Sequence, residues 1–83
     1  MKNKFQGQDL VIHVKTNIKY IILEVPNNIV KLEYCNEPYY RYIPENYLDK
    51  GRAVEVWIRC KSEMEDGRFT KVVSLQRMGK YEE

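Results

Sequence analysis

Residues 9–25 read DLVIHVKTNIKYIILEV and decide the fold class. Apolar side chains in residues 9–15 recur at every second position, which is the period of a half-buried strand. Thr16-Asn17 interrupts this run, and residues 18–25 are rich in β-branched and aromatic side chains that suit a pleated sheet. The pattern predicts two consecutive strands, the second of which ends at Pro26.

The remainder of the chain carries the same signal. Further strands are expected at residues 29–35, 53–62 and 68–78, which makes five, and residues 39–43 are also compatible with a short strand. Pro44 opens one predicted helical turn over residues 44–49, and Asp66-Gly67 is a hairpin signal between the last two strands. Residues 1–7 and 79–83 are expected to fray.

Size and composition limit the architecture to one small domain. The chain has 83 residues, of which 43% are hydrophobic and 31% charged, an ordinary balance for a folded protein. A series of short strands separated by turns favours a small five-stranded β-barrel with one helical turn, because closure protects strand edges without a large core. The formal net charge of +2 neither requires nor excludes a polyanionic partner.

Several function classes are disfavoured. The apolar runs are far shorter than the roughly 20 residues of a membrane span, and no secretory signal opens the sequence, so a cytoplasmic location and no membrane partner are expected. The only histidine, His13, has no companion motif for catalysis. Cys35 and Cys60 lack zinc-ligand spacing and are expected to be free, buried thiols. We therefore predict a protein without enzymatic activity, metal or cofactor.

The strand predicted at 53–62 contains the most informative surface pattern. If its apolar alternate residues face inward, Trp57, Arg59 and Lys61 face outward, and the same alternation places Tyr20 on the outer face of residues 18–25. A large aromatic side chain among cations can stack on a base. This pattern predicts binding of single-stranded nucleic acid by Tyr20, Trp57, Arg59 and Lys61, with Arg52 and Lys71 contacting the backbone.

A second cluster supports a different function. Residues 39–42 read YYRY, and Tyr39, Tyr40, Arg41 and Tyr42 together suit a protein interface. We therefore keep a protein-interaction module or small inhibitor as the alternative function, although Tyr34 and one of Tyr40 or Tyr42 are expected to turn into the core. Free edge strands could also pair copies of the chain into a homo-oligomer.

Two resemblances accompany these patterns. Residues 47–56, YLDKGRAVEV, and 66–73, DGRFTKVV, resemble the last part of an oligonucleotide-binding (OB) fold of the single-stranded-DNA-binding type. This resemblance implies an OB-like barrel that binds single strands, and it covers about the last 40% of the chain. Residues 42–48, YIPENYL, are instead similar to the Ile-Pro-x-Asn-Tyr-Val ending of Src-homology barrels, which implies a groove for proline-rich peptides.

Overall fold

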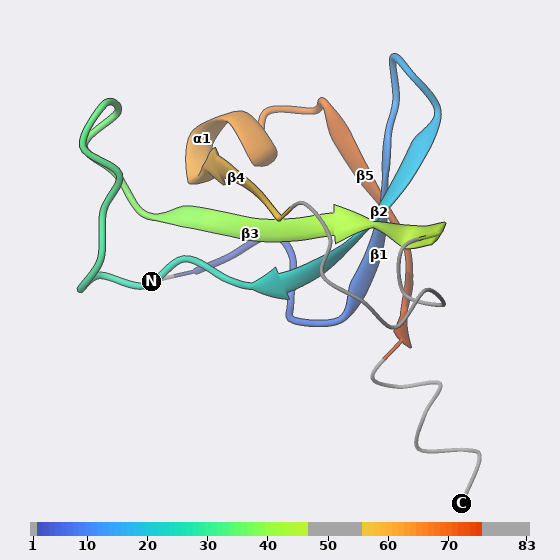
Figure 1. Cartoon of the computed structure of the whole chain (residues 1–83), viewed down its shortest axis with the longest axis horizontal. Helices are drawn as coiled ribbons and strands as arrows, with labels where there is room; N and C mark the ends of the chain where they lie inside the picture. The colour runs from blue at the N-terminus through green and yellow to red at the C-terminus, as the bar shows by residue number, and fades with distance from the viewer. Residues whose placement is uncertain (1, 47–55, 76–83) are drawn as a thin grey trace, which may run out of the picture.

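The computed structural model describes residues 2–46 and 56–75, which form one antiparallel sheet with one short helix (Figure 1). In chain order the elements are β1 (Asp9–His13), β2 (Ile18–Glu24), β3 (Tyr39–Pro44), β4 (Trp57–Cys60), α1 (Lys61–Met64) and β5 (Phe69–Ser74). The prediction of a β-rich fold with five strands is confirmed. No helix in these residues is long and apolar enough to cross a membrane.

The strands lie in the order β4-β3-β2-β1-β5, and each is antiparallel to its neighbours. The strands β1 to β4 therefore follow one another across the sheet, and β5 returns beside β1. In the turn between β1 and β2, Asn17 adopts a φ of 64° and donates its N–H to the His13 carbonyl at 2.7 Å. Asparagine tolerates this left-handed conformation, so the predicted break at Thr16-Asn17 is confirmed as a tight turn.

The sheet is strongly curved. The guanidinium of Arg59 on β4 lies 5.7 Å from the ring centroid of Phe69 on β5, although these strands occupy opposite edges. The ring of Tyr42 on β3 also reaches Phe69, with 5.8 Å between centroids. Among the described residues no strand pairing joins β4 to β5, so the sheet is curved but open.

Both faces of the central strands are buried. The sequence pattern predicted strands with only one buried face. On the concave face, Val11 and Ile22 belong to the main core cluster. On the opposite face, Leu10 and Ile21 are paired in register and pack with Ile43 in a second cluster. Side chains therefore alternate between the two faces as predicted, but the side chains on both faces are buried.

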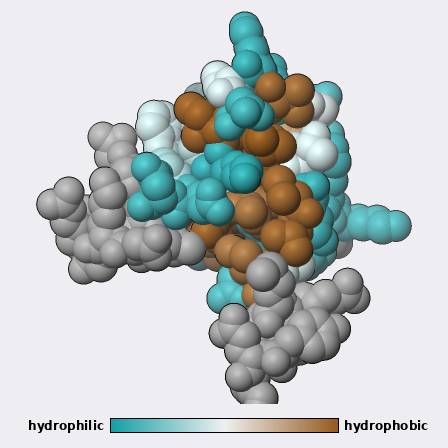
Figure 2. Space-filling model, turned by 90° about the vertical axis from the view of Figure 1, so that its right-hand side faces the viewer, coloured by the Kyte–Doolittle hydropathy of each residue, from teal (hydrophilic) through white to brown (hydrophobic). Residues whose placement is uncertain are grey.

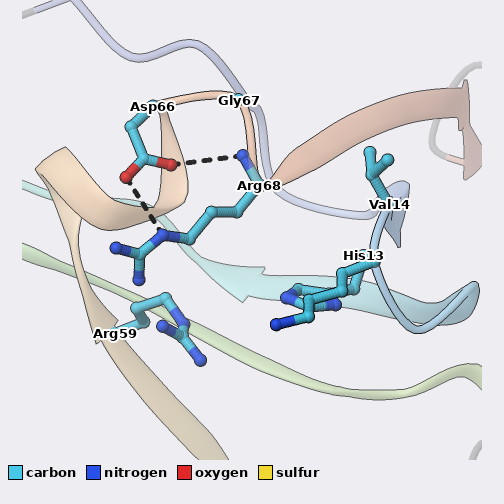
Figure 3. Close-up of a pocket in the computed structure, with 7 residues that line it drawn as sticks. His13, Val14, Arg59, Asp66, Gly67 and Arg68 are labelled. Atoms are coloured by element: carbon cyan, nitrogen blue, oxygen red, sulfur yellow. Dashed lines mark hydrogen bonds and ion pairs between the residues drawn. The ribbon is translucent and has the colours of Figure 1, made fainter.

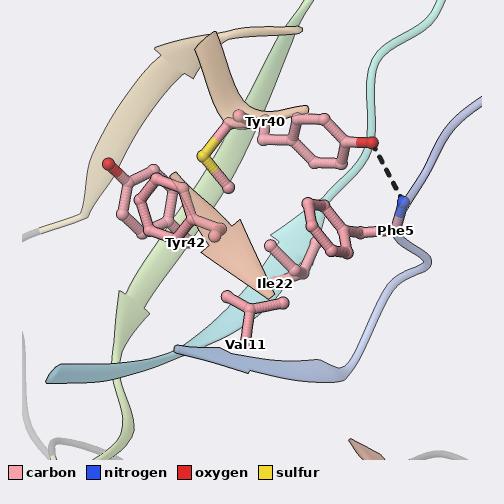
Figure 4. Close-up of a cluster of buried hydrophobic side chains, with 7 residues drawn as sticks. Phe5, Val11, Ile22, Tyr40 and Tyr42 are labelled. Atoms are coloured by element: carbon pink, nitrogen blue, oxygen red, sulfur yellow. Dashed lines mark hydrogen bonds between the residues drawn. The ribbon is translucent and has the colours of Figure 1, made fainter. Parts of the chain in front are cut away.

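The main core fixes the start of the chain (Figure 4). Phe5 is 1% exposed and packs edge-on against Tyr40, with 5.8 Å between ring centroids. The Tyr40 hydroxyl accepts a hydrogen bond from the Phe5 N–H at 3.2 Å and donates one to Glu65 Oε2 at 2.5 Å. The prediction that residues 1–7 fray is therefore wrong for residues 2–7, because an aromatic anchor and a buried hydroxyl hold them.

The strand predicted at residues 29–35 is absent, and this segment is a structured loop. Asn27 Oδ1 accepts hydrogen bonds from the N–H groups of Ile29 and Val30 at 2.8 and 3.0 Å, which closes a turn at the position where a strand was expected. Tyr34, expected to face the core, is 72% exposed. Figure 2 shows one face of the molecule on which hydrophobic side chains reach the surface between hydrophilic ones.

The predicted long hairpin between residues 53–62 and 68–78 is also wrong. Strand β4 ends at Cys60 and is followed by α1, whose Met64 is fully buried in the main core. Gly67 does form the expected turn, with a φ of 108° that favours glycine, but this turn leads into β5 at the other edge of the sheet. Anchoring of α1 by Met64 separates the two strands.

Parts of the predicted helical turn at 44–49 and of the predicted strands at 53–62 and 68–78 cannot be compared with the structure. They fall in residues 47–55 and 76–83, which lie outside the described residues.

Cys35 and Cys60 form a disulfide bond, so the prediction of free thiols is wrong. The bond joins the loop after β2 to the end of β4 across a sequence separation of 25 residues. Hydrogen bonds reinforce the same junction, because the Lys61 N–H donates to the Pro38 carbonyl at 2.9 Å and the Ser62 N–H donates to Glu37 Oε1 at 2.7 Å. We call this junction of residues 35–38 with 60–62 the tether.

Candidate functional site

Arg59 is the centre of the candidate site. It lies on β4 opposite Tyr40, and directly opposed residues of an antiparallel pair share a face, so its side chain follows the concave face of the sheet. Arg59 Nε donates to the Tyr42 hydroxyl at 3.2 Å, and Nη1 donates to Glu63 Oε1 at 3.3 Å. The predicted outward orientation of Arg59 is therefore wrong, because the concave face turns toward this residue.

Aromatic rings surround this guanidinium. Tyr20 meets Tyr42 edge-on at 5.1 Å between centroids and Phe69 at 6.0 Å. Tyr20 shares its face with Ile22 and packs against the main core, so its predicted place on the outer face is also wrong. It remains partly exposed, which leaves part of an aromatic surface open beside a cation.

Trp57 extends this aromatic surface. It lies opposite Tyr42 in the register of β3 and β4, and it is 48% exposed. The alternation predicted for residues 53–62 is inverted here, since Trp57 and Arg59 share the face of the main core while Ile58, expected inside, is 46% exposed. We call the surface formed by Tyr20, Trp57 and Arg59 the aromatic–cationic face.

A cleft adjoins this face (Figure 3). It has a volume of about 690 Å³ and lies between residues 13–15, at the turn after β1, and residues 66–68, at the turn before β5, with Arg59 also lining it. The Val14 N–H donates to the Arg68 carbonyl at 2.9 Å and joins the two turns. The His13 ring is held edge-on to Phe69, with 4.9 Å between ring centroids, and its Nδ1 is 2.9 Å from Thr16 Oγ1.

Positive charge predominates in the cleft. Lys15, Arg59 and Arg68 contribute three cations, and Asp66 is the one acidic residue in the lining. Arg68 Nε lies 3.1 Å from Asp66 Oδ2, and Glu63 Oε1 lies 3.7 Å from Arg68 Nη1 and 3.3 Å from Arg59 Nη1. The carboxylates of Glu63 and Asp66 thus orient the two arginines, but they do not balance all three positive charges of the cleft.

Protonation states follow from these contacts. The hydrogen bond to Tyr42 raises the pKa of Arg59, burial opposes this effect, and the charge of Glu63 adds to the increase. Burial raises the pKa of Tyr20, and neighbouring Tyr42 raises it further, while the charge of Arg59 lowers it. The site therefore presents a permanent cation beside a neutral phenol, an arrangement that attracts anions and π-systems together.

Of the remaining predicted nucleic-acid contacts, Lys61 and Lys71 do not line the cleft, and each pairs with a carboxylate outside it. Lys61 Nζ on α1 pairs with Glu65 Oε1 at 2.6 Å, at the tether. Lys71 Nζ on β5 lies 3.7 Å from Oδ2 of Asp9, a carboxylate that is fully buried. Arg52 lies outside the described residues.

The tyrosine-rich segment is divided between core and surface. Tyr40 and Tyr42 are 0% and 3% exposed, so the expectation that at least one of them faces inward is confirmed. Tyr39 and Arg41 lie on the other face of β3 and are partly exposed, and Arg41 Nη1 pairs with Glu24 at 3.4 Å. The surface that this segment offers a partner therefore consists of Tyr39 and Arg41.

Sequence reasoning missed the contribution of His13, Lys15 and Arg68. Arg68 is far from His13 and Lys15 along the chain, and the pairing of β1 with β5, which places His13 opposite Phe69, brings it beside them. Periodicity gives no signal for such a contact. The described residues contain no group of three His, Cys, Asp or Glu side chains that could hold a metal ion.

Comparison with protein-family models, with curated proteins and with solved structures found no match for this chain.

Proposed function

We propose that this protein is a non-enzymatic module that binds single-stranded nucleic acid on the aromatic–cationic face. The observation that carries the proposal is the position of Arg59, whose guanidinium lies among Tyr42, Phe69 and Tyr20 while Trp57 stands half-exposed on the same face. Bases stack on aromatic rings and on guanidinium planes, and unpaired strands offer their base faces for this contact. The adjacent cations supply attraction for the phosphate backbone.

The architecture that we propose for this module is a small, open barrel. The approach of Arg59 on one edge strand to Phe69 on the other supports it. Of the two resemblances, the strand order favours the Src-homology-like barrel, because an OB barrel has Greek-key connectivity, in which the fourth strand returns beside the first. Here β4 stays beside β3, and β5 makes the return. Fold alone does not set function, so the proposal depends on the side chains of the face.

Trp57 provides the direct test, because it is the only tryptophan of the chain. Its fluorescence is titrated with a single-stranded oligothymidylate, a duplex of the same length and single-stranded RNA, at low and moderate salt. We expect quenching by single strands and a slope of log K against log salt of about −2, because three cations contact phosphates at roughly 0.7 each. Quenching by none of the three probes, with the protein shown to be folded, would refute the proposal.

A pair of arginine variants provides the matched control. Arg59→Gln removes the cation from the aromatic–cationic face, whereas Arg41→Gln makes the same change on the other face of the neighbouring strand. We expect Arg59→Gln to weaken binding of the oligothymidylate about tenfold and to reduce the salt slope by about 0.7. Equal effects of the two variants would show that only overall charge matters and would contradict a defined site.

Protein binding is the second candidate function, and the loop after β2 favours it. Ile29 is 90% exposed and Tyr34 is 72% exposed, although internal hydrogen bonds and the tether hold the loop in one shape. Large exposed side chains on an ordered loop are typical of interface anchors. Such a contact would change little with salt, whereas nucleic-acid binding weakens steeply.

The predicted cytoplasmic location stays a prediction, and the disulfide weighs against it. Disulfide bonds persist mainly in oxidising compartments, and cytosolic ones are usually transient. The bond between Cys35 and Cys60 joins two segments that also share hydrogen bonds, so it has the setting of a structural bond.

A further inference from the structure

The cleft beside the aromatic–cationic face has the composition of a site for a compact anion. Its three cations come from three separate segments: Lys15 from the turn after β1, Arg59 from β4 and Arg68 from the turn before β5. Figure 3 shows the Arg59 and Arg68 side chains on one side of the cleft and His13 facing them from the other. Cations that converge from separate segments repel one another, and Glu63 and Asp66 offset part of this repulsion, so a bound anion would offset more of it.

The resident carboxylates leave donors available. Arg59 uses Nε for Tyr42 and Nη1 for Glu63, and Arg68 uses Nε for Asp66 and Nη1 for Glu63. Within residues 2–46 and 56–75, the structure records no partner for Nη2 of either arginine or for Lys15 Nζ. Each cation can therefore donate to a ligand while the carboxylates hold both guanidinium groups in place.

We infer that the cleft binds the terminal phosphate of a nucleic-acid strand. A terminal phosphomonoester carries a charge of about −1.5 to −2 and three acceptor oxygens, whereas an internal phosphodiester has a single charge and two free oxygens. The donors without a recorded partner in the described residues, Nη2 of both arginines and Lys15 Nζ, match the three acceptor oxygens of the monoester better. This inference rests on the proposed function, because Arg59 belongs to both the cleft and the face on which the adjoining base would stack.

Gly67 lines the cleft without a side chain. A Cβ placed there would have no heavy atom within 4 Å, so the described residues do not crowd the cleft at this position. The hydrogen bond from the Val14 N–H to the Arg68 carbonyl closes the junction between the two turns. A strand whose terminal phosphate occupies the cleft can then continue along Tyr20 and Trp57.

The experiment compares three forms of one oligothymidylate, with a 5′-phosphate, with a 3′-phosphate and with neither, and adds inorganic phosphate as a separate probe. Binding is measured by calorimetry, and the amide resonances of Gly67 and Arg68 report occupation of the cleft. We expect one phosphorylated form to bind about tenfold more tightly than the unphosphorylated strand. Arg68→Gln and Lys15→Gln should each abolish this preference, and Arg41→Gln should preserve it.

A variant that is expected to raise affinity tests whether the cleft binds a ligand or is only a structural feature. Glu63 competes for both arginines, so Glu63→Gln should strengthen binding of the phosphorylated strand several-fold, although it removes two ion pairs. A residue that only stabilised the fold would not raise affinity when replaced.

The outcomes distinguish this inference from the proposed function. Equal binding of all three strands, with no shift at Gly67 or Arg68, would overturn the terminal-phosphate site and leave single-strand binding intact. Inorganic phosphate that shifts these resonances, while no strand binds, would overturn both the proposed function and the terminal-phosphate site and would leave a site for free phosphate. Binding of neither strand nor phosphate would overturn both.

Discussion

The tether and the cleft hold distant parts of the chain together by different means. At the tether, Cys35 is bonded covalently to Cys60, and Glu37 accepts hydrogen bonds from both the N–H and the hydroxyl of Ser62. At the cleft, the Val14–Arg68 hydrogen bond and the edge-on contact of His13 with Phe69 join the two turns, and the exposed ion pairs of Arg68 stay within residues 63–68. Within the described residues, Glu37 uses both carboxylate oxygens for Ser62 at the tether, whereas Nη2 of Arg59 and of Arg68 has no recorded partner at the cleft. We therefore expect the tether to contribute mainly to stability and the cleft to contribute mainly to binding.

The largest effect should come from opening the tether. Replacing both cysteines by serine removes a cross-link over 25 residues, and we expect the free energy of unfolding to fall by about 3 kcal/mol because the unfolded chain gains conformational entropy. Urea denaturation of the oxidised protein, the reduced protein and the double variant measures this loss. The reduced protein should match the variant, and a loss below about 1 kcal/mol would contradict a structural role for the bond.

A somewhat smaller effect is expected at the buried hydroxyl beside the tether. Tyr40→Phe removes the group that accepts from the Phe5 N–H and donates to Glu65, and it leaves a buried amide without its partner. We expect a loss of about 2 kcal/mol in urea denaturation. Tyr39→Phe is the matched control on the other face of β3, and its stability should change by no more than about 0.5 kcal/mol. Equal losses in both variants would contradict the assignment.

The same hydroxyl contributes to a pH dependence. Burial alone would raise the pKa of Glu65, but hydrogen bonds from the Lys4 N–H, Lys61 and Tyr40 outweigh it and hold this pKa below its ordinary value. A carboxylate with a lowered folded-state pKa contributes stability above its unfolded-state pKa and loses it as the pH falls through the folded-state value.

We therefore expect the protein to lose unfolding free energy through Glu65 as the pH falls below the ordinary glutamate pKa and through the lower folded-state pKa, and we expect Glu65→Gln to lose less over the same range. Urea denaturation between pH 3 and pH 7 measures both curves. Glu33→Gln, at an exposed position in the loop after β2, should retain the full pH dependence of the original chain. Parallel curves for the original chain and Glu65→Gln would contradict this assignment.

Sequence alone predicted some parts of this molecule well. The β-rich class, the strand at 18–25 and the short strand at 39–43 were correct, because periodicity and turn residues are local properties. The faces of Trp57, Arg59 and Tyr20 were wrong, since both faces of the curved sheet are apolar and alternation cannot rank them. The disulfide and the cleft depend on contacts between residues 25 or more positions apart, for which a single sequence gives no signal.

The smallest effect on stability should come from a substitution in the cleft. This result would sharpen the contrast between the tether and the cleft. Arg68 and its partners are 39–47% exposed, and exposed ion pairs contribute little, so Arg68→Gln should change the unfolding free energy by about 0.5 kcal/mol or less. The same variant should nevertheless lose the preference for the 5′- or 3′-phosphorylated strand over the unphosphorylated one. Urea denaturation and calorimetry on one protein sample test both halves of this statement. A large loss of stability would mean that the arginine holds the two turns together as the disulfide holds the tether, and the cleft would then be a structural junction.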